Sequence, residues 1–297
     1  MATDKFISEL KEKFRQGDIV TRLLYLNAGI FVAVSLANIV LLLFRWPAAG
    51  WTHYLELPAY LPQLARQPWS VLTYMFMHAS LLHLVFYMLW LYWFGRLFLQ
   101  FFSSRHLQGL YLLGGVMGGL LYVAAFNVFP YFSDAVHLSW LLGASASVLA
   151  IVFAVGMSQP DFEVQFLLLG RLRLKYVALG VFLLDLLFIT SDNGGGHIAH
   201  IGGAMAGVWF VMGLRKGYDV TRGINRIIDG LSRPFQRPAR KPKMKVHYGD
   251  RKKDYDYNAR KKERNEQIDH ILDKLRKSGY NSLSDEEKRQ LFDASKK

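Results

Sequence analysis

The hydrophobic residues of this chain gather into six long runs, all within the first 214 residues. Five of the runs are uncharged, and the fifth along the chain contains Arg173 and Lys175 at its start and Asp185 further on. A bilayer core about 30 Å thick is crossed by about 20 mostly apolar helical residues. The pattern therefore predicts an all-α, polytopic membrane protein with six transmembrane helices. The predicted spans are residues 23–44, 78–95, 110–129, 138–157, 172–190 and 196–214.

After the last span the pattern changes to a polar tail. Residues 236–264 are rich in Lys, Arg, Pro and Asp and predict a flexible linker. Apolar residues then recur at helical spacing from Ile268 to Leu275, which predicts one amphipathic helix. Ser284 followed by Glu287 is a capping-box signature for a second helix. The tail therefore predicts a small helical hairpin, whose binding partner the sequence does not identify.

The same patterns divide the chain into four segments. Residues 1–22 are a cytoplasmic amphipathic segment, and residues 23–214 form the six-helix transmembrane domain. Residues 215–264 are a basic cytoplasmic linker, and residues 265–297 form the hairpin.

Composition supports a membrane protein. Of 297 residues 52% are hydrophobic, and the mean hydropathy is +0.14 although 20% are charged, which excludes a disordered chain and an ordinary soluble domain. The net charge of +13 lies mainly in the tail, because residues 215–297 carry 24 Lys and Arg against 13 Asp and Glu. A basic tail beside a membrane favours contact with the lipid bilayer over nucleic acid. The absence of cysteine excludes thiol nucleophiles and thiolate metal sites.

Basic residues also predict the orientation. Lys and Arg precede the first span, separate the second and third, precede the fifth and follow the sixth, so all of these segments lie on one side. Positively charged loops stay in the cytoplasm. Both termini are therefore expected to be cytoplasmic, and a short N-terminus without an Arg- and Ser-rich transit segment favours the bacterial plasma (inner) membrane.

Polar side chains inside the spans are costly in a bilayer, so each one is a functional hypothesis. They are His78, His83, Ser145 within Gly143-Ala144-Ser145-Ala146, Asp185, His197 and His200. The predicted topology brings the serine and up to four histidines, from three different helices, into the outer half of the membrane. Because the fourth span begins outside at residue 138, Ser145 should lie within a helix about 10 Å below the outer surface.

A serine beside a histidine can act as a nucleophile with its general base, and His83 can donate to the oxyanion. Each residue also has a simpler interpretation. Gly-Ala-Ser-Ala is typical of helix packing, and His78 and His83 can be structural. Asp185 is interpreted as bonding a neighbouring helix, and His197 as a loop or helix-start residue. The sequence predicts neither a metal ion nor a cofactor.

Three segments together resemble the rhomboid intramembrane serine proteases. They are residues 69–95 with the two histidines, residues 143–146, which are similar to Gly-x-Ser-Gly, and residues 199–207, which are similar to Ala-His-x-x-Gly-x-x-x-Gly. The resemblance implies that Ser145 is the nucleophile and His200 the base.

The resemblance also implies that the Ser145 N–H and His83 bind the oxyanion. It further implies that Gly203 and Gly207 pack the sixth helix on the fourth. Four positions depart from the family pattern. Tyr87 replaces a usual Asn donor, Ala146 replaces the final Gly of the serine motif, Leu149 replaces an aromatic residue, and Ser70 stands where a Trp-Arg pair would have its Arg. The sequence does not place an acid to orient His200.

The leading hypothesis is an intramembrane serine endopeptidase that cleaves transmembrane protein substrates near the outer face of the membrane. The first alternative is a non-catalytic relative that binds or escorts client transmembrane helices. The second is a small transporter that uses the histidines and Asp185 as a proton path, although the sequence has no visible inverted repeat. Reactivity of Ser145 discriminates the protease from both.

Overall fold

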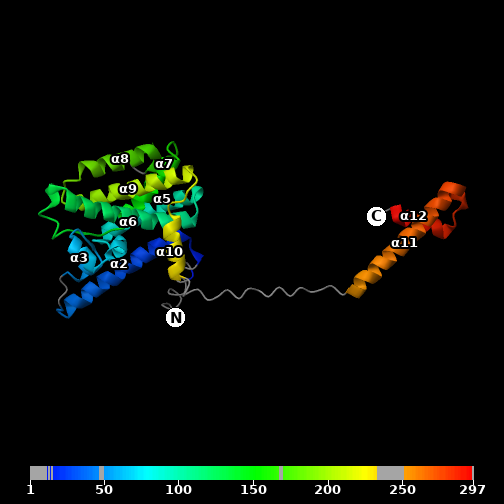
Figure 1. The fold of residues 1–297 in the computed structure, drawn as a ribbon, viewed down its shortest axis with the longest axis horizontal. Helices are drawn as coiled ribbons and strands as arrows, with labels where there is room; N and C mark the ends of the chain where they lie inside the picture. Colours follow the sequence, from blue (N-terminus) through cyan, green and yellow to red (C-terminus); the bar gives the residue numbers. More distant parts are fainter. Residues whose placement is uncertain are drawn as a thin grey trace. The chain divides into compact units, whose positions relative to one another are not determined.

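The computed structural model describes residues 12, 14, 16–46, 50–166, 170–232 and 251–295. Most of the predicted N-terminal amphipathic segment and residues 233–250 of the predicted linker lie outside the described residues. The chain is mostly helical and divides into two compact units, Met1–Phe235 and Gln236–Lys297, of which the first contains all the predicted spans (Figure 1).

Among the described residues, four helices are long and apolar enough to cross a membrane. Two further apolar helices have 14 residues each. The four long helices are α2 (Ile19–Leu43), α5 (Leu81–Phe101), α6 (Ser104–Val128) and α9 (Gly194–Arg215), and the two short ones are α7 (Ser145–Ser158) and α8 (Leu174–Leu187). Each of the six overlaps one predicted span.

Short elements connect these helices. Between α2 and α5 lie η1 (Trp51–Tyr54), β1 (Leu57–Pro58), α3 (Leu61–Arg66), α4 (Ser70–Thr73) and η2 (Tyr74–Phe76). Between α6 and α7 lie η3 (Pro130–Phe132) and β2 (Trp140–Leu141). Between α7 and α8 lies the antiparallel pair β3 (Glu163–Phe166) and β4 (Gly170–Arg173), and α10 (Arg222–Ser232) follows α9.

Polar side chains cap the starts of three long helices. Asp18 accepts a hydrogen bond from the Thr21 N–H at 2.9 Å, and Ser80 and Ser103 cap α5 and α6 in the same way. At the other end, α5 continues past the predicted boundary at residue 95, and Arg96 within it forms an ion pair with Asp18 at 3.0 Å. The charge therefore lies within a helix rather than in a loop.

The helices α6, α7 and α9 pack on one another at the centre of the first unit, with α5 against α7, and α8 against both α7 and α9 (Figure 1). Glycines allow the close approach. A Cβ on Gly203 would collide with the Ala146 carbonyl of α7, and one on Gly207 would collide with the Ala150 carbonyl. Small residues of this kind are common where membrane helices touch.

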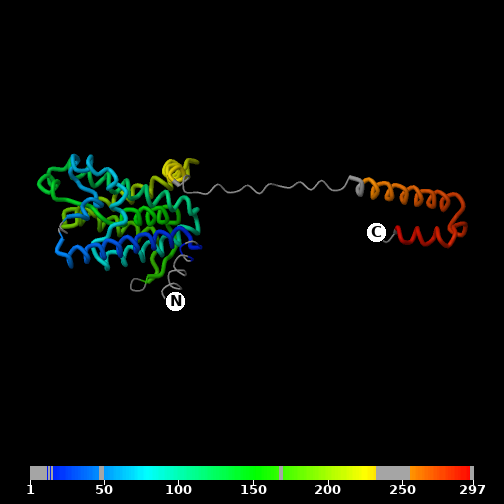
Figure 2. Tube along the Cα trace, turned by 90° about the horizontal axis from the view of Figure 1, so that it is seen from below, coloured from blue at the N-terminus to red at the C-terminus, as the bar shows by residue number. Residues whose placement is uncertain are grey.

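The outward faces of the helices are apolar. Exposed residues include Leu36 and Leu43 of α2, Leu82 of α5 and Leu187 of α8. Such a surface is suited to lipid and not to water. The chain is therefore an integral membrane protein. Figure 2 shows α10 end-on, so this helix runs across the direction of the long helices.

The fourth predicted span begins later than expected. Residues 138–144 are not helical, because β2 pairs with β1 and the Gly143 N–H donates to the Tyr74 carbonyl at 2.9 Å. Gly143 also has a φ of +130°, which lies outside the helical region and favours glycine. The prediction that the helix of Ser145 begins at residue 138 is thus wrong, since Ser145 is the first residue of α7 and is not preceded by two turns of helix.

The second unit is a helical hairpin made of α11 (Arg251–Ser278), η5 (Tyr280–Ser282) and α12 (Asp285–Ser295). The capping box is confirmed: the Ser284 N–H donates to Glu287 at 2.7 Å, and the Glu287 N–H donates back to Ser284 at 3.3 Å. The Ser284 N–H and the Lys274 ammonium hold the pKa of Glu287 below its ordinary value. The helix α11 includes residues 251–264, which the sequence analysis assigned to the linker.

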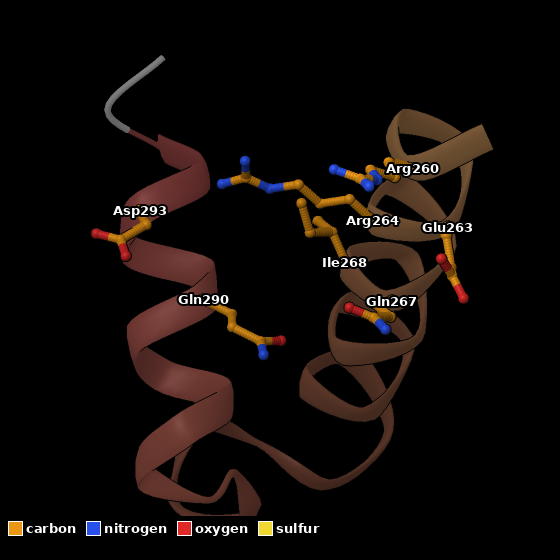
Figure 3. Close-up of a pocket in the computed structure, with 7 residues that line it drawn as sticks. All are labelled: Arg260, Glu263, Arg264, Gln267, Ile268, Gln290 and Asp293. Carbon is orange, nitrogen blue, oxygen red and sulfur yellow. The ribbon is translucent and has the colours of Figure 1, made fainter. Parts of the chain in front are cut away.

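Between α11 and α12 lies a polar cleft. Figure 3 shows Arg264 and Ile268 of α11 directed towards α12, with Gln290 on the opposite side. Below it, Ile271 and Leu283 are buried, and Lys274 bonds Glu287 across the hairpin at 2.9 Å. A core of this size gives the hairpin little apolar stabilisation, which makes the ion pair and the capping box important for its shape.

Candidate active site

Ser145 lies at the amino end of α7 and is 8% exposed. The first hydrogen bond of this helix joins the Val148 N–H to the Ala144 carbonyl at 2.9 Å. The N–H groups of residues 145–147 therefore precede the hydrogen bonds of the helix and are available to a ligand. Together with the positive end of the helix dipole they favour a negative charge beside Ser145.

His83 and Ser145 flank Gly143. A Cβ on Gly143 would lie 3.1 Å from Cε1 of His83 and 3.6 Å from Oγ of Ser145. The Ala79 N–H donates to Nδ1 of His83 at 3.3 Å. Because Nδ1 accepts this bond, the proton of the neutral ring is on Nε2, which lies on the Gly143 side. The structure thus directs an imidazole N–H donor towards the space beside Ser145.

His200 is held by Asp185. Nδ1 of His200 lies 2.7 Å from Oδ1 of Asp185, and the two residues are 7% and 5% exposed. An ionised carboxylate only accepts hydrogen bonds, so Nδ1 carries the proton and Nε2 keeps its lone pair. This is the tautomer that a general base requires.

The Asp185 carboxylate also holds His197, whose Nδ1 lies 2.8 Å from the same Oδ1. Asp185 is on α8, whereas both histidines are on α9. The interpretation that Asp185 bonds a neighbouring helix therefore agrees with the structure. The expectation that no acid orients His200 is wrong.

Tyr87 lies between the two proposed catalytic groups. Its hydroxyl is 3.4 Å from Nε2 of His200, and it also interacts with the side chain of Ser145. Among the hydrogen bonds of the described residues there is none directly between Ser145 and His200. Hydrogen bonds between catalytic groups are often long or displaced before substrate binds.

His78 lies beside this group without joining its hydrogen bonds. The side chain is buried, its ring centroid is 5.5 Å from that of His83, and neither ring nitrogen has a hydrogen-bond partner among the described residues. Gly203 and Gly207 follow His200 along α9 and contact α7 through backbone, away from the polar groups. The structure thus brings Gly143, Ser145, His83, Tyr87 and His200 together.

Asp185 and His197 were given no role at the site in the sequence analysis. For each of them the sequence contains one signal that points to the site. Asp185 is the acidic residue of the predicted fifth span, and such a residue needs a partner. His197 and His200 are three residues apart, which places them on one face of a helix. The arrangement of serine, imidazole, carboxylate and N–H donors is suited to acyl transfer.

Comparisons with known proteins concern both units. A family model described as the Rhomboid domain matches residues 65–217, which include Tyr87, Ser145 and His200. A model described as a family of unknown function (DUF6576) matches residues 251–297. The curated zebrafish (Danio rerio) protein "Presenilin-associated rhomboid-like protein A, mitochondrial" is 29% identical over 143 residues, or 46% of this chain. The aligned region spans only 35% of that relative's length.

Proposed function

Because the chain belongs to the rhomboid family, we propose that it is an intramembrane serine endopeptidase whose nucleophile is Ser145 and whose base is His200. One observation carries the proposal: the Asp185 carboxylate holds His200 in the tautomer that leaves Nε2 free to accept a proton. A histidine that served only to join two helices would not need its second nitrogen to face the Tyr87 hydroxyl, which in turn interacts with Ser145.

In the proposed reaction, a substrate carbonyl accepts a hydrogen bond from the Tyr87 hydroxyl, which leaves Nε2 of His200 free to accept one from Ser145. Oγ of Ser145 attacks the carbonyl carbon while Nε2 takes the hydroxyl proton. The oxyanion accepts hydrogen bonds from the N–H groups at the start of α7 and from Nε2–H of His83. His200 then returns the proton to the leaving amine, and water hydrolyses the acyl-enzyme by the same steps in reverse order.

The proposal extends to topology and substrates. The shorter helices α7 and α8 complete a six-span domain, residues 23–214, with the termini in the cytoplasm and the site near the outer face. The chain would lie in a bacterial plasma membrane, and its substrates would be transmembrane proteins that reach the site from the lipid. The basic linker and the hairpin would form separate cytoplasmic segments.

Covalent labelling tests this function. A fluorophosphonate probe reacts with a serine only where a base activates it, so we expect the full chain in detergent to be labelled. Ser145→Ala and His200→Ala should both abolish labelling. Ser147→Ala is the matched control, because Ser147 is a buried serine of the same helix whose hydroxyl lacks a hydrogen-bond partner within the described chain. This variant should be labelled like the wild type.

The result also discriminates between the two functions that the sequence allows. If the folded wild type is not labelled and does not cut a transmembrane substrate in lipid, the protease proposal is wrong. The same site would then serve a protein that binds client helices. Labelling that persists in Ser145→Ala would instead assign the nucleophile to another serine.

Tyr87→Phe is expected to lower kcat about 10-fold to 100-fold with little change in KM. The phenol is one of several donors that can reach the oxyanion, and loss of one such donor is a moderate effect. Tyr87→Asn should recover part of the loss, because an amide also donates and the family usually has Asn at this position. Tyr92→Phe is the control, since Tyr92 is on the same helix but exposed. An unchanged kcat in Tyr87→Phe would remove the hydroxyl from the mechanism.

A further inference from the structure

Asp185, His197 and His200 form a cluster of potential metal ligands beside the proposed catalytic serine. Their ligand atoms all lie within 4.8 Å of one another. Both imidazoles direct Nδ1 towards one carboxylate oxygen, at 2.8 and 2.7 Å. The two histidines come from one face of α9 and the acid from α8, so the cluster links two helices.

We propose that this cluster binds Zn²⁺ and that the bound ion inhibits the protease, an inference that rests on the proposed function. Two imidazoles and one carboxylate are a common protein ligand set for zinc, with water in the fourth position. Nitrogen ligands disfavour Mg²⁺ and Ca²⁺, which prefer oxygen. The sequence pattern alone did not predict a metal.

Zinc binding requires the three ligand atoms to move towards tetrahedral spacing. Zinc lies about 2.0–2.2 Å from nitrogen and oxygen ligands, so tetrahedral neighbours are about 3.3 Å apart. The Nδ1 to Oδ1 distances of 2.7 and 2.8 Å would lengthen slightly to admit the ion. The two rings stand nearly perpendicular, at 83°, with centroids 5.8 Å apart, so that they approach the carboxylate from different directions.

Charge and access also favour a cation. An ionised Asp185 with two neutral imidazoles leaves one negative charge nearly buried within an apolar helix bundle, which attracts a cation. His197 is partly exposed, with 21% of its side chain accessible, in the first turn of α9. The residues just before this turn, Ser191, Asp192 and Asn193, are exposed, so the ion has a route from solvent.

Inhibition follows from the tautomer of His200. In the metal-free site Nδ1–H donates to Asp185 and Nε2 is unprotonated. Zinc binds an imidazole nitrogen that carries no proton. The ring proton therefore moves from Nδ1 to Nε2, with no net gain or loss, and Nε2 can no longer take the proton of Ser145. The bound ion leaves the helices in place and removes the base.

Calorimetry on the full chain tests binding without depending on activity. Ser145→Ala protein in detergent is titrated with Zn²⁺, and with Mg²⁺ for comparison. We expect one Zn²⁺ per chain and no Mg²⁺ binding, with affinity reduced at least about 100-fold by adding His197→Ala. His137→Ala is the matched control, because His137 is an exposed histidine outside the cluster and should leave zinc affinity unchanged.

Cleavage of a transmembrane substrate tests inhibition. Zinc should inhibit the wild type at least about 10-fold and a chelator should restore the rate, whereas the cleavage rate that His197→Ala retains should not respond to the same zinc concentration. Failure to bind zinc, or equal binding by His197→Ala, would overturn the inference. If zinc binds as expected but the fluorophosphonate probe never labels Ser145, the metal site stands and the proposed protease, with its inhibition, fails.

Discussion

Ser145→Ala and His200→Ala are each expected to lower kcat for a transmembrane substrate by a factor on the order of 10⁴ or more. Neither alanine can replace the group that attacks the carbonyl or the group that moves the proton. The remaining rate would come only from substrate binding and the N–H donors at the start of α7. The measurement is single-turnover cleavage in lipid vesicles with each purified variant.

The double variant sharpens this prediction. A nucleophile and its base act in one step, so removing both should cost no more than removing either. A multiplicative loss in the double variant would mean that the two residues act in different steps. Ser147→Ala should cleave like the wild type. The unfolding temperatures of all variants should show that the helices remain packed. Ser145→Ala, for example, removes only one oxygen atom, at the amino end of α7.

The helices were the most predictable part of the fold. Long uncharged runs identify α2 to within four residues at each end and α9 to within two, because a bilayer requires apolar length and little else. The start of α6 lies six residues before the predicted one. The start of α7 was not predictable from hydropathy. Residues 138–144 are as apolar as a helix, but β2 pairs with β1, and Gly143 takes a positive φ to meet Tyr74. Contacts distant in sequence decide that boundary.

The same limit applies to the site. The types of residue, a serine and histidines within the apolar spans, were predictable because polar groups are rare in spans. Their partners were not. Whether Asp185 faces lipid, α7 or α9 depends on the rotation of α8 about its axis. The sequence of this short, mostly apolar helix has too few polar residues to indicate that rotation. The position of the Tyr87 hydroxyl was also not predictable. The side chain is longer than the expected Asn, yet its hydroxyl lies beside Nε2 of His200.

The tail illustrates a different weakness. The capping box of α12 is a local signal and was found, because both hydrogen bonds are made within four residues. The start of α11 was missed because residues 251–264 have few aliphatic residues. Arg, Lys and Glu favour helix even without an apolar face, so intrinsic propensity was a better guide there than periodicity.

Asp185→Asn is expected to lower kcat about 10²-fold to 10³-fold, or roughly 3–4 kcal/mol of transition-state stabilisation, with little change in KM. The amide has no charge to stabilise the imidazolium that forms during proton transfer. It can also present N–H to Nδ1 of His200, which would place the ring proton on Nε2. KM should stay close to the wild-type value, because Asp185 is nearly buried and bonded to histidines of α9 and so acts on His200 rather than on the substrate.

The split between kcat and KM separates a positioning role from a structural one. Asp192→Asn is the matched control, because Asp192 is an exposed acid beyond the same helix and its loss should change neither constant. Asp185→Glu should recover part of kcat, since it keeps the carboxylate at a displaced position. If Asp185→Asn lowers only the unfolding temperature and leaves kcat intact, the carboxylate serves to join α8 to α9, and His200 would be oriented by the helix packing alone.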